Sequence, residues 1–225
     1  MSIIMFFIVS LIIPIILTIY IYLKVNIKFS INIFFIGFLT FFISQILIRI
    51  PILQYITYLG ISYNNTFIKQ VLLCLSAGLV EVGADYLAFK FVIKKNTLGK
   101  SIVVGLAHGF CENLLLISLP LVITIINGNY VQLSYMASFE RLFALIAHIA
   151  FALIAFCAIE NRSIIYLLIG ILLHGFNDLL IFIIPNLYIM EISIALFSIL
   201  ELIMILILIG KNKYINLYDD IHLFK

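Results

Sequence analysis

About seven apolar stretches of roughly 20 residues, the length that an α-helix needs to cross a bilayer, follow one another along this chain. Its 225 residues are 65% hydrophobic and 10% charged, and the mean hydropathy is +1.30. Because a water-soluble domain has about 25% charged residues, no soluble fold could hide this much apolar surface. We therefore predict an all-α fold, a polytopic bundle of about seven transmembrane helices, in a multi-pass protein of the cell membrane.

Hydropathy and helix breakers predict helices at residues 3–23, 29–52, 67–92, 101–126, 137–159, 164–184 and 187–209. The first stretch lacks the basic start and the cleavage site of a signal peptide, so we expect it to be retained. Residues 1–210 are predicted to form one transmembrane domain, with a polar core from about 67 to 184, and residues 211–225 a short cytoplasmic tail. The apolar surroundings of Cys74, Cys111 and Cys157 favour small buried side chains over a disulfide or a metal site.

Basic residues occur in alternate connections between the predicted helices. The first, third and fifth connections and the tail are basic, at Lys24, Lys28, Lys94, Lys95, Lys100, Arg162, Lys211 and Lys213. The connections at residues 64–65, 127–134 and 185–186 have neither lysine nor arginine. Since basic loops stay in the cytoplasm, the N-terminus is predicted to face outwards and the C-terminus to face the cytoplasm.

Several predicted helices carry polar and ionisable residues that a bilayer disfavours. An ionisable group at mid-bilayer costs at least about 2.5–3.5 kcal/mol on insertion scales, and such groups usually face the bundle interior and mark a functional path. They are concentrated on four helices, at Glu81, Asp85, His108, Glu112, Asn113, Glu140, Arg141, His148, His174, Asn177 and Asp178. Arg49 and Glu201 are isolated on other helices, and we expect them to be structural ion-pair partners or interfacial groups.

Four of these side chains are predicted to lie at the same depth. Glu81 is about 13 residues before the basic end of its helix, Glu112 and His174 are about 12 residues after the basic end of theirs, and His148 is about 12 residues before the end of its own. At roughly 1.5 Å per residue, all four lie about 18–20 Å from the cytoplasmic end. Four helices can therefore contribute to one polar layer.

The spacing within the helices adds to this layer. His108 with Glu112, His174 with Asp178, and Glu81 with Asp85 are each four residues apart, so each pair shares one helix face. Carboxylates with two or three imidazoles at one depth are typical of a zinc site, which uses nitrogen and oxygen ligands and leaves a position for water. The alternative is a set of interhelical hydrogen bonds that only hold the bundle together. Glu140 and Arg141, nearer the outer end, also suit an ion pair or an interfacial anchor.

The ordered set of these motifs resembles the YhfC-type family of membrane peptidases, relatives of the PrsW and CAAX-protease group of membrane-embedded metalloproteases. The resemblance spans about residues 70 to 180 and rests on four motifs: Glu81-Val82-Gly83-Ala84-Asp85-Tyr86, Gly105-Leu106-Ala107-His108-Gly109-Phe110-Cys111-Glu112, Glu140-Arg141 followed by His148, and His174-Gly175-Phe176-Asn177-Asp178. The first motif departs from the family pattern, because Val82 stands where relatives have a second glutamate and Asp85 where they have a basic residue.

The resemblance implies hydrolysis of a peptide bond in or beside the membrane. It implies Glu81 as the general base, with Glu112, His148 and His174 as metal ligands or oxyanion stabilisers, and His108 as a ligand or a group that orients one. The predicted catalytic residues are Glu81, Asp178, Glu140 and Arg141, and the predicted ligands of Zn²⁺ or another divalent metal are Glu112, His148, His174 and His108. The expected partners are the lipid bilayer and a peptide or membrane-protein substrate, with no nucleic acid.

Two other functions fit the same residues. Chains of glutamate, aspartate and histidine in helices also form relays in proton-coupled or metal-ion transporters, although no clear internal repeat of the kind common in transporters is present. A catalytically degenerate relative, which only binds a peptide or acts as an immunity-type protein, is the third possibility. Uptake into proteoliposomes that depends on Glu81 but not on metal occupancy would indicate transport, and function that survives a change of Glu81 would indicate binding alone.

Overall fold

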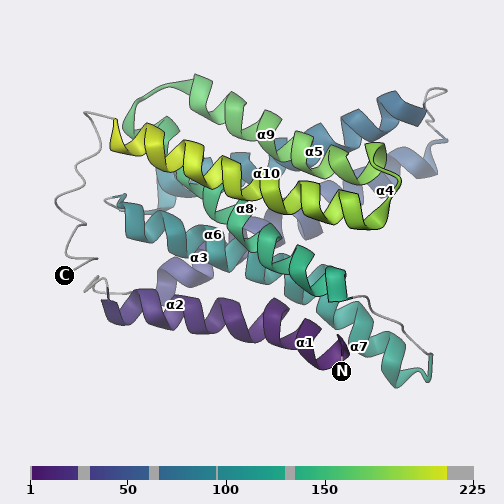
Figure 1. Cartoon of the computed structure of the whole chain (residues 1–225). Coiled ribbons are helices and arrows are strands. Elements are labelled where there is room, and N and C mark those ends of the chain that lie inside the picture. Colours follow the sequence, from purple (N-terminus) through teal and green to yellow (C-terminus); the bar gives the residue numbers. More distant parts are fainter. Residues whose placement is uncertain (1, 25–30, 61–65, 95, 130–134, 212–225) are drawn as a thin grey trace.

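The described part of the chain forms seven helical rods, each a continuous run of helical segments (Figure 1). The computed structural model describes residues 2–24, 31–60, 66–94, 96–129 and 135–211, and no strand occurs in these ranges. The rods are α1 Ser2–Phe7 with η1 Ile8–Ile12 and α2 Ile13–Lys24; α3 Ile31–Phe41 with η2 Phe42–Arg49 and α4 Ile50–Tyr58; α5 Thr66–Leu87 with η3 Ala88–Val92; α6 Leu98–Glu112 with η4 Asn113–Ser118 and α7 Leu119–Ile126; α8 Tyr135–Glu160; α9 Ile164–Ile183; and α10 Leu187–Gly210, where η marks a π-helical segment.

Six of the rods are long and apolar enough to cross a bilayer. The first rod contains a shorter apolar stretch, Ile3–Leu17, so a seventh span stays a prediction. The prediction of a polytopic all-α bundle is confirmed, and the chain is a multi-pass integral membrane protein in contact with lipid. The predicted end of the second helix at residue 52 is wrong, because that rod continues to Tyr58. Most of the predicted tail, residues 212–225, lies outside the described part.

Three prolines lie inside rods without ending them, and each follows a π-helical segment. Pro14, Pro51 and Pro120 occupy the second residue of α2, α4 and α7, directly after η1, η2 and η4. Proline lacks the N–H for the helical hydrogen bond, and its ring clashes with the carbonyl four residues earlier. A wider π-helical turn at that place relieves the clash, and such turns are frequent at functional sites. The prolines thus explain why the rods widen at η2 and η4, beside the polar residues of the bundle.

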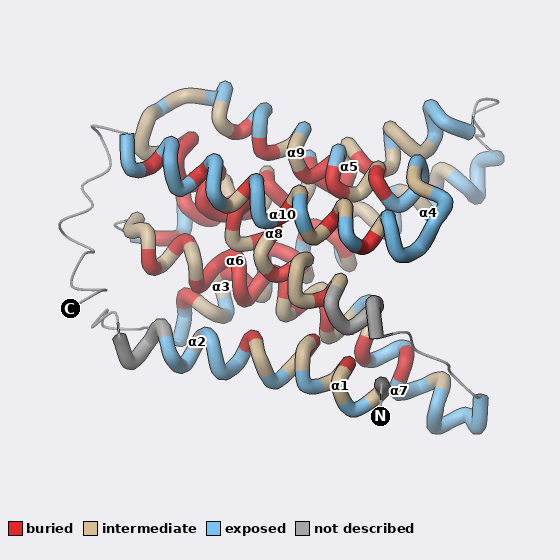
Figure 2. Tube along the Cα trace, viewed as in Figure 1, coloured by how far each residue is buried: buried red, intermediate tan, exposed pale blue. Residues whose placement is uncertain are grey.

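Helix α8 lies at the centre of the bundle and is its most buried element (Figure 2). It packs against α6 and α10 and more loosely against α5 and α9, while α5 pairs with α9 and α3 with α6. Its residues 150–158 are almost completely buried and form the middle of the apolar core. The rod α1–α2 forms one edge of the bundle and α9 the opposite edge (Figure 1). The polar side chains of α5, α6, α8 and α9 therefore face one shared interior.

Two glycines allow these helices to approach closely beside the polar residues. A Cβ atom on Gly105 of α6 would lie 2.5 Å from the carbonyl oxygen of His148 in α8. A Cβ atom on Gly78 of α5 would lie 2.5 Å from the carbonyl oxygen of Ile171 and 3.1 Å from the Cβ atom of His174 in α9. Small residues at such contacts let membrane helices pack backbone to backbone. The close contacts bring both histidines near the carboxylate of α5.

We expect Gly78→Ala to destabilise the protein, and Gly83→Ala, five residues further along α5, to leave its stability unchanged or raise it slightly. The new methyl group at position 78 must push against the backbone of α9, an overpacking that costs about 1–3 kcal/mol. At Gly83 nothing lies within 4 Å of the added Cβ atom, and alanine favours a helix over glycine by up to about 1 kcal/mol. Thermal unfolding of both variants in detergent measures the difference. Equal shifts in the two midpoints would contradict the close approach.

Candidate metal centre

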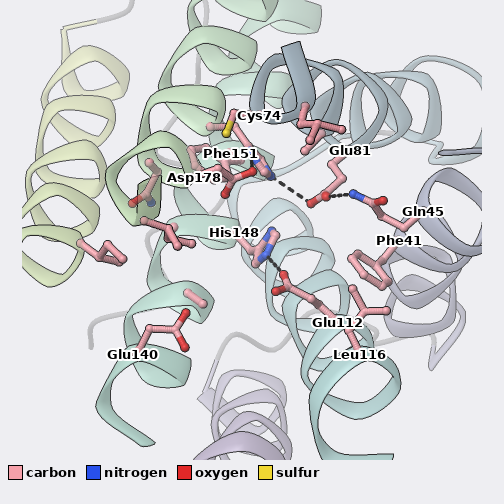
Figure 3. Close-up of a pocket in the computed structure, with 18 of the residues that line it drawn as sticks. Phe41, Gln45, Cys74, Glu81, Glu112, Leu116, Glu140, His148, Phe151 and Asp178 are labelled. Atoms are coloured by element: carbon pink, nitrogen blue, oxygen red, sulfur yellow. Dashed lines mark hydrogen bonds and ion pairs between the residues drawn. The ribbon is translucent and has the colours of Figure 1, made fainter. Parts of the chain in front are cut away.

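A carboxylate and two imidazoles from three helices meet in the middle of the bundle. Glu81 of α5, His148 of α8 and His174 of α9 each offer one ligand atom, and these atoms lie within 4.8 Å of one another. All three residues are buried, at 5% exposure each. Figure 3 shows the side chains of Glu81 and His148 directed towards the same space. The predicted polar layer is therefore present, and its members are close enough to share one small ligand.

Both oxygens of the Glu81 carboxylate are engaged. Its Oε2 atom lies 2.9 Å from Nε2 of His174 and 3.3 Å from Nε2 of His108. Its Oε1 atom accepts a hydrogen bond from the side-chain amide of Gln45 in η2 (Figure 3). Four rods thus contribute to the position of this one carboxylate.

His108 of α6 is completely buried and links Glu81 to a second carboxylate. Its Nδ1 atom lies 3.0 Å from Oδ1 of Asp85 and 2.9 Å from the hydroxyl of Thr40. That hydroxyl donates its hydrogen to the carbonyl of Gly37, at 2.7 Å, so it can accept from the ring. Both ring nitrogens of His108 therefore face oxygen atoms of the protein. Asp85 thus holds this histidine in place.

A second part of the network surrounds Glu112 at the end of α6. Its Oε2 atom lies 2.5 Å from Nε2 of His148, and its Oε1 atom accepts from Nη1 of Arg141 at 3.1 Å. The Arg141 guanidinium also donates to the side-chain oxygen of Asn113 at 3.3 Å and to both carboxylate oxygens of Glu140. The predicted Glu140–Arg141 pair is thus an ion pair within the bundle, and it holds the carboxylate that contacts His148.

Packing against an aromatic ring helps to hold His174 in place, whereas its Nδ1 atom contributes little. Its ring stacks on Phe151 of α8 with 4.6 Å between the ring centroids. Its Nδ1 atom is 3.4 Å from Oδ2 of Asp178, an ion-pair distance, but the atom is buried and makes no hydrogen bond within the described residues. Asp178 is half-exposed, with 38% of its side chain accessible. Asp178 therefore lies beside His174 as a nearby charge.

A cavity of about 360 Å³ lies against the cluster (Figure 3). It extends from Glu81, Glu112, His148 and His174 to Phe182, in the last turn of α9. Apolar walls come from residues such as Phe41, Leu116 and Phe151, and the charged groups that line it are Arg49, Glu81, Glu112, Glu140, Arg141 and Asp178. Ligand pockets of about 300–1,000 Å³ with apolar walls and a few converging polar groups are typical of small-molecule and peptide side-chain sites.

The donors present suit a divalent metal ion. Two imidazoles and one or two carboxylates are nitrogen and oxygen ligands of the kind that zinc uses in catalytic sites. Glu81, His148 and His174 are buried together, and Glu112 joins them through its contact with His148. Cys74, Cys111 and Cys157 are buried, as predicted for small buried side chains, and Cys74 is part of the cavity lining.

The prediction from the sequence left out Gln45 and did not connect Arg49 to this network. Gln45 contacts Glu81, and Arg49 contacts Gln45 through Nη1 at 3.1 Å. Their spacing of four residues, on one face of a helix, was the available signal. Arg49 and Glu201 were expected to be ion-pair partners or interfacial groups, and neither has an ion-pair partner within the described residues: Arg49 contacts only neutral acceptors, and Glu201 is fully buried with both carboxylate oxygens unpaired. The catalytic and ligand roles of the other predicted residues stay predictions.

Comparison with known proteins shows the family of the chain. A family model described as the YhfC intramembrane metalloprotease matches residues 9–134 and 131–204, which include every member of the cluster. The chain is also 27% identical over 181 residues to a protein of Bacillus subtilis (strain 168) described as "uncharacterized membrane protein YhfC", across 65% of this chain and 70% of that protein. No solved structure matches the chain. On the extent of the family match, the chain belongs to the YhfC intramembrane metalloprotease family.

Proposed function

We propose that this chain is a membrane-embedded, metal-dependent endopeptidase that hydrolyses a peptide bond in or near the bilayer. The observation that carries the proposal is the buried meeting of Glu81, His148 and His174 from three helices, with ligand atoms within 4.8 Å, beside a cavity of about 360 Å³. A metalloprotease family implies a divalent metal, and the two histidines of this group are candidate ligands for it. The substrate class is a peptide or a segment of a membrane protein.

His148, His174 and Glu112 are the proposed ligands, and the nitrogen-rich set favours zinc. A divalent ion held by them supplies a Lewis acid that polarises a peptide carbonyl and makes water easier to deprotonate. Glu112 contacts His148 already, and the Arg141 guanidinium fixes the other oxygen of Glu112. Asp178 lies beside Nδ1 of His174, where an acidic partner orients a ligating imidazole.

Glu81 is the proposed general base. Its carboxylate lies beside both ligand histidines at the cavity, so it can take a proton from an attacking water and return it to the leaving amine. Gln45 and His108 hold its two oxygens from different helices. Because both ring nitrogens of His108 face oxygens of Thr40, Asp85 and Glu81, we assign this histidine to positioning Glu81 and not to the metal.

The function is tested by proteolysis that depends on metal. The purified chain is reconstituted in liposomes with a library of apolar peptides, and mass spectrometry identifies new termini. We expect cleavage that a chelator abolishes and that a divalent metal, zinc first, restores, since the Lewis acid is part of the site. Cleavage that continues at full rate after complete metal removal would overturn the metallopeptidase proposal. Metal uptake into empty liposomes without cleavage would favour the transporter.

A further inference from the structure

A second guanidinium, that of Arg49, lines the same cavity and has no carboxylate partner in the described part of the chain. Its Nε atom donates to the hydroxyl of Ser76 at 3.1 Å, Nη1 to the side-chain oxygen of Gln45 at 3.1 Å, and Nη2 to the carbonyl oxygen of Leu73 at 2.8 Å. All three acceptors are uncharged. An arginine has five N–H donors, so two remain for a further partner.

The other arginine of the cavity is already neutralised. Arg141 makes ion pairs with both Glu140 and Glu112. The guanidinium of Arg49, by contrast, contacts no carboxylate in the described residues, because the side chain of Gln45 lies between it and Glu81. A charge inside a membrane protein is costly unless it has a partner or reaches water, and such groups usually mark the path of a ligand. Of the two guanidinium groups that line the cavity, Arg49 is thus the one available to an anion.

We propose that Arg49 binds a carboxylate of the substrate peptide, either its C-terminal carboxylate or an acidic side chain; the inference rests on the proposed peptidase function. The planar guanidinium matches a carboxylate with two parallel hydrogen bonds, which gives both strength and orientation. The other guanidinium of the cavity wall, Arg141, is paired with two carboxylates, and the carboxylates of Glu81 and Asp178 on the same wall repel an anion. An incoming carboxylate is therefore directed to Arg49.

The contact through Gln45 also limits the distance between the bound carboxylate and the peptide bond that is cleaved. Arg49 and Glu81 are joined by one side-chain amide with a hydrogen bond at each end. These links limit the separation to at most about 8 Å, which about two residues of extended chain span. The substrate bond beside Glu81 therefore lies within about two residues of the carboxylate that Arg49 holds. If the carboxylate is the C-terminal one, the product is a short C-terminal fragment.

The experiment measures binding, apart from turnover, in the Glu81→Gln variant, whose amide keeps an acceptor for Gln45. The probes are three fluorescent six-residue apolar peptides: one with a free C-terminal carboxylate, its C-terminal amide, and the amide with one internal glutamate. We expect the free acid or the glutamate peptide to bind about 10- to 100-fold more tightly than the plain amide, the range for a hydrogen bond to a charged group. The peptide that gains affinity identifies the source of the carboxylate.

Variants of Arg49 then test the assignment. Arg49→Gln is expected to abolish the preference for the acid, and Arg49→Lys, which keeps the charge but loses the planar fork, to retain part of it. Arg162→Gln, on an exposed turn between α8 and α9, is the matched control and should keep the preference in full. Equal binding of all three peptides, or a preference that survives Arg49→Gln, would overturn the inference. If the parent chain cleaves peptides but binds the acid and the amide equally, the role of Arg49 is refuted and the peptidase function stands. If the acid is preferred through Arg49 but no peptide is cleaved, the peptidase function is refuted and the role of Arg49 in binding stands.

Discussion

Glu81→Gln is expected to lower the rate of peptide cleavage about 100- to 10,000-fold, the range that a positioned general base contributes. The amide keeps the size of the side chain, and its oxygen can still accept the hydrogen bond from Gln45 while its NH2 group faces His174, but it cannot take a proton from water. Because Glu81 is the carboxylate that lies with both His148 and His174 at the cavity, no other group in the described cluster replaces it in this position. The measurement is the initial rate of cleavage of one reporter peptide in liposomes.

The matched control for this change is Glu160→Gln. Glu160 ends α8, about 12 residues or roughly 18 Å along the helix from His148, and is partly exposed. Loss of its carboxylate should leave the rate within about twofold, since surface changes away from a site have small effects. A Glu81→Gln variant that folds, as judged by an unchanged elution profile and thermal midpoint, yet cleaves at the rate of the control would show that Glu81 is not the base.

The fold was largely predictable because hydropathy and connection charge are strong signals in a membrane chain. The bilayer forces each span to be helical and apolar, so the bounds of most rods follow from the sequence within a few residues. The continuation of the second rod past Pro51 was not predictable from the proline alone, because a proline ends most helices. It continues because the π-helical turn of η2 relieves the clash, a response of the backbone that residue types do not specify.

The candidate site was predictable in its depth and less so in its contacts. Matched positions on four helices indicated that Glu81, Glu112, His148 and His174 share one layer, as the structure shows. The depth of a residue in the membrane does not tell how its helix is rotated about its own axis. The pairing of Glu81 with His174 and of Glu112 with His148 therefore could be seen only in the structure. The contribution of Gln45 was missed because an uncharged amide is a weak signal beside so many ionisable groups.

The first motif shows why a residue pattern alone does not give the contacts. The resemblance alone implies a basic residue at the position of Asp85 and a second glutamate at the position of Val82. In the structure Asp85 contacts His108, while a cation from another helix, Arg49, reaches Glu81 through Gln45. These contacts therefore join helices that lie far apart in the sequence.

The most direct measurement for the central claim is the metal content of the chain purified in mild detergent. We expect about one divalent ion per chain, which three or four protein ligands of a catalytic zinc site can hold. In the double variant His148→Ala with His174→Ala we expect almost no bound metal. Removing a residue that only hydrogen-bonds to a ligand lowers metal affinity roughly 10- to 100-fold, and removing two ligands lowers it by far more.

His108→Ala is the matched control, since it removes a buried imidazole of the same network whose nitrogens both face protein oxygens. Elemental analysis of the parent chain, the double variant and this control gives the result. One ion in the parent and the control, with none in the double variant, is the outcome that the account predicts. A parent chain that binds no divalent ion even after zinc is supplied, or a double variant that retains a full equivalent, would contradict it.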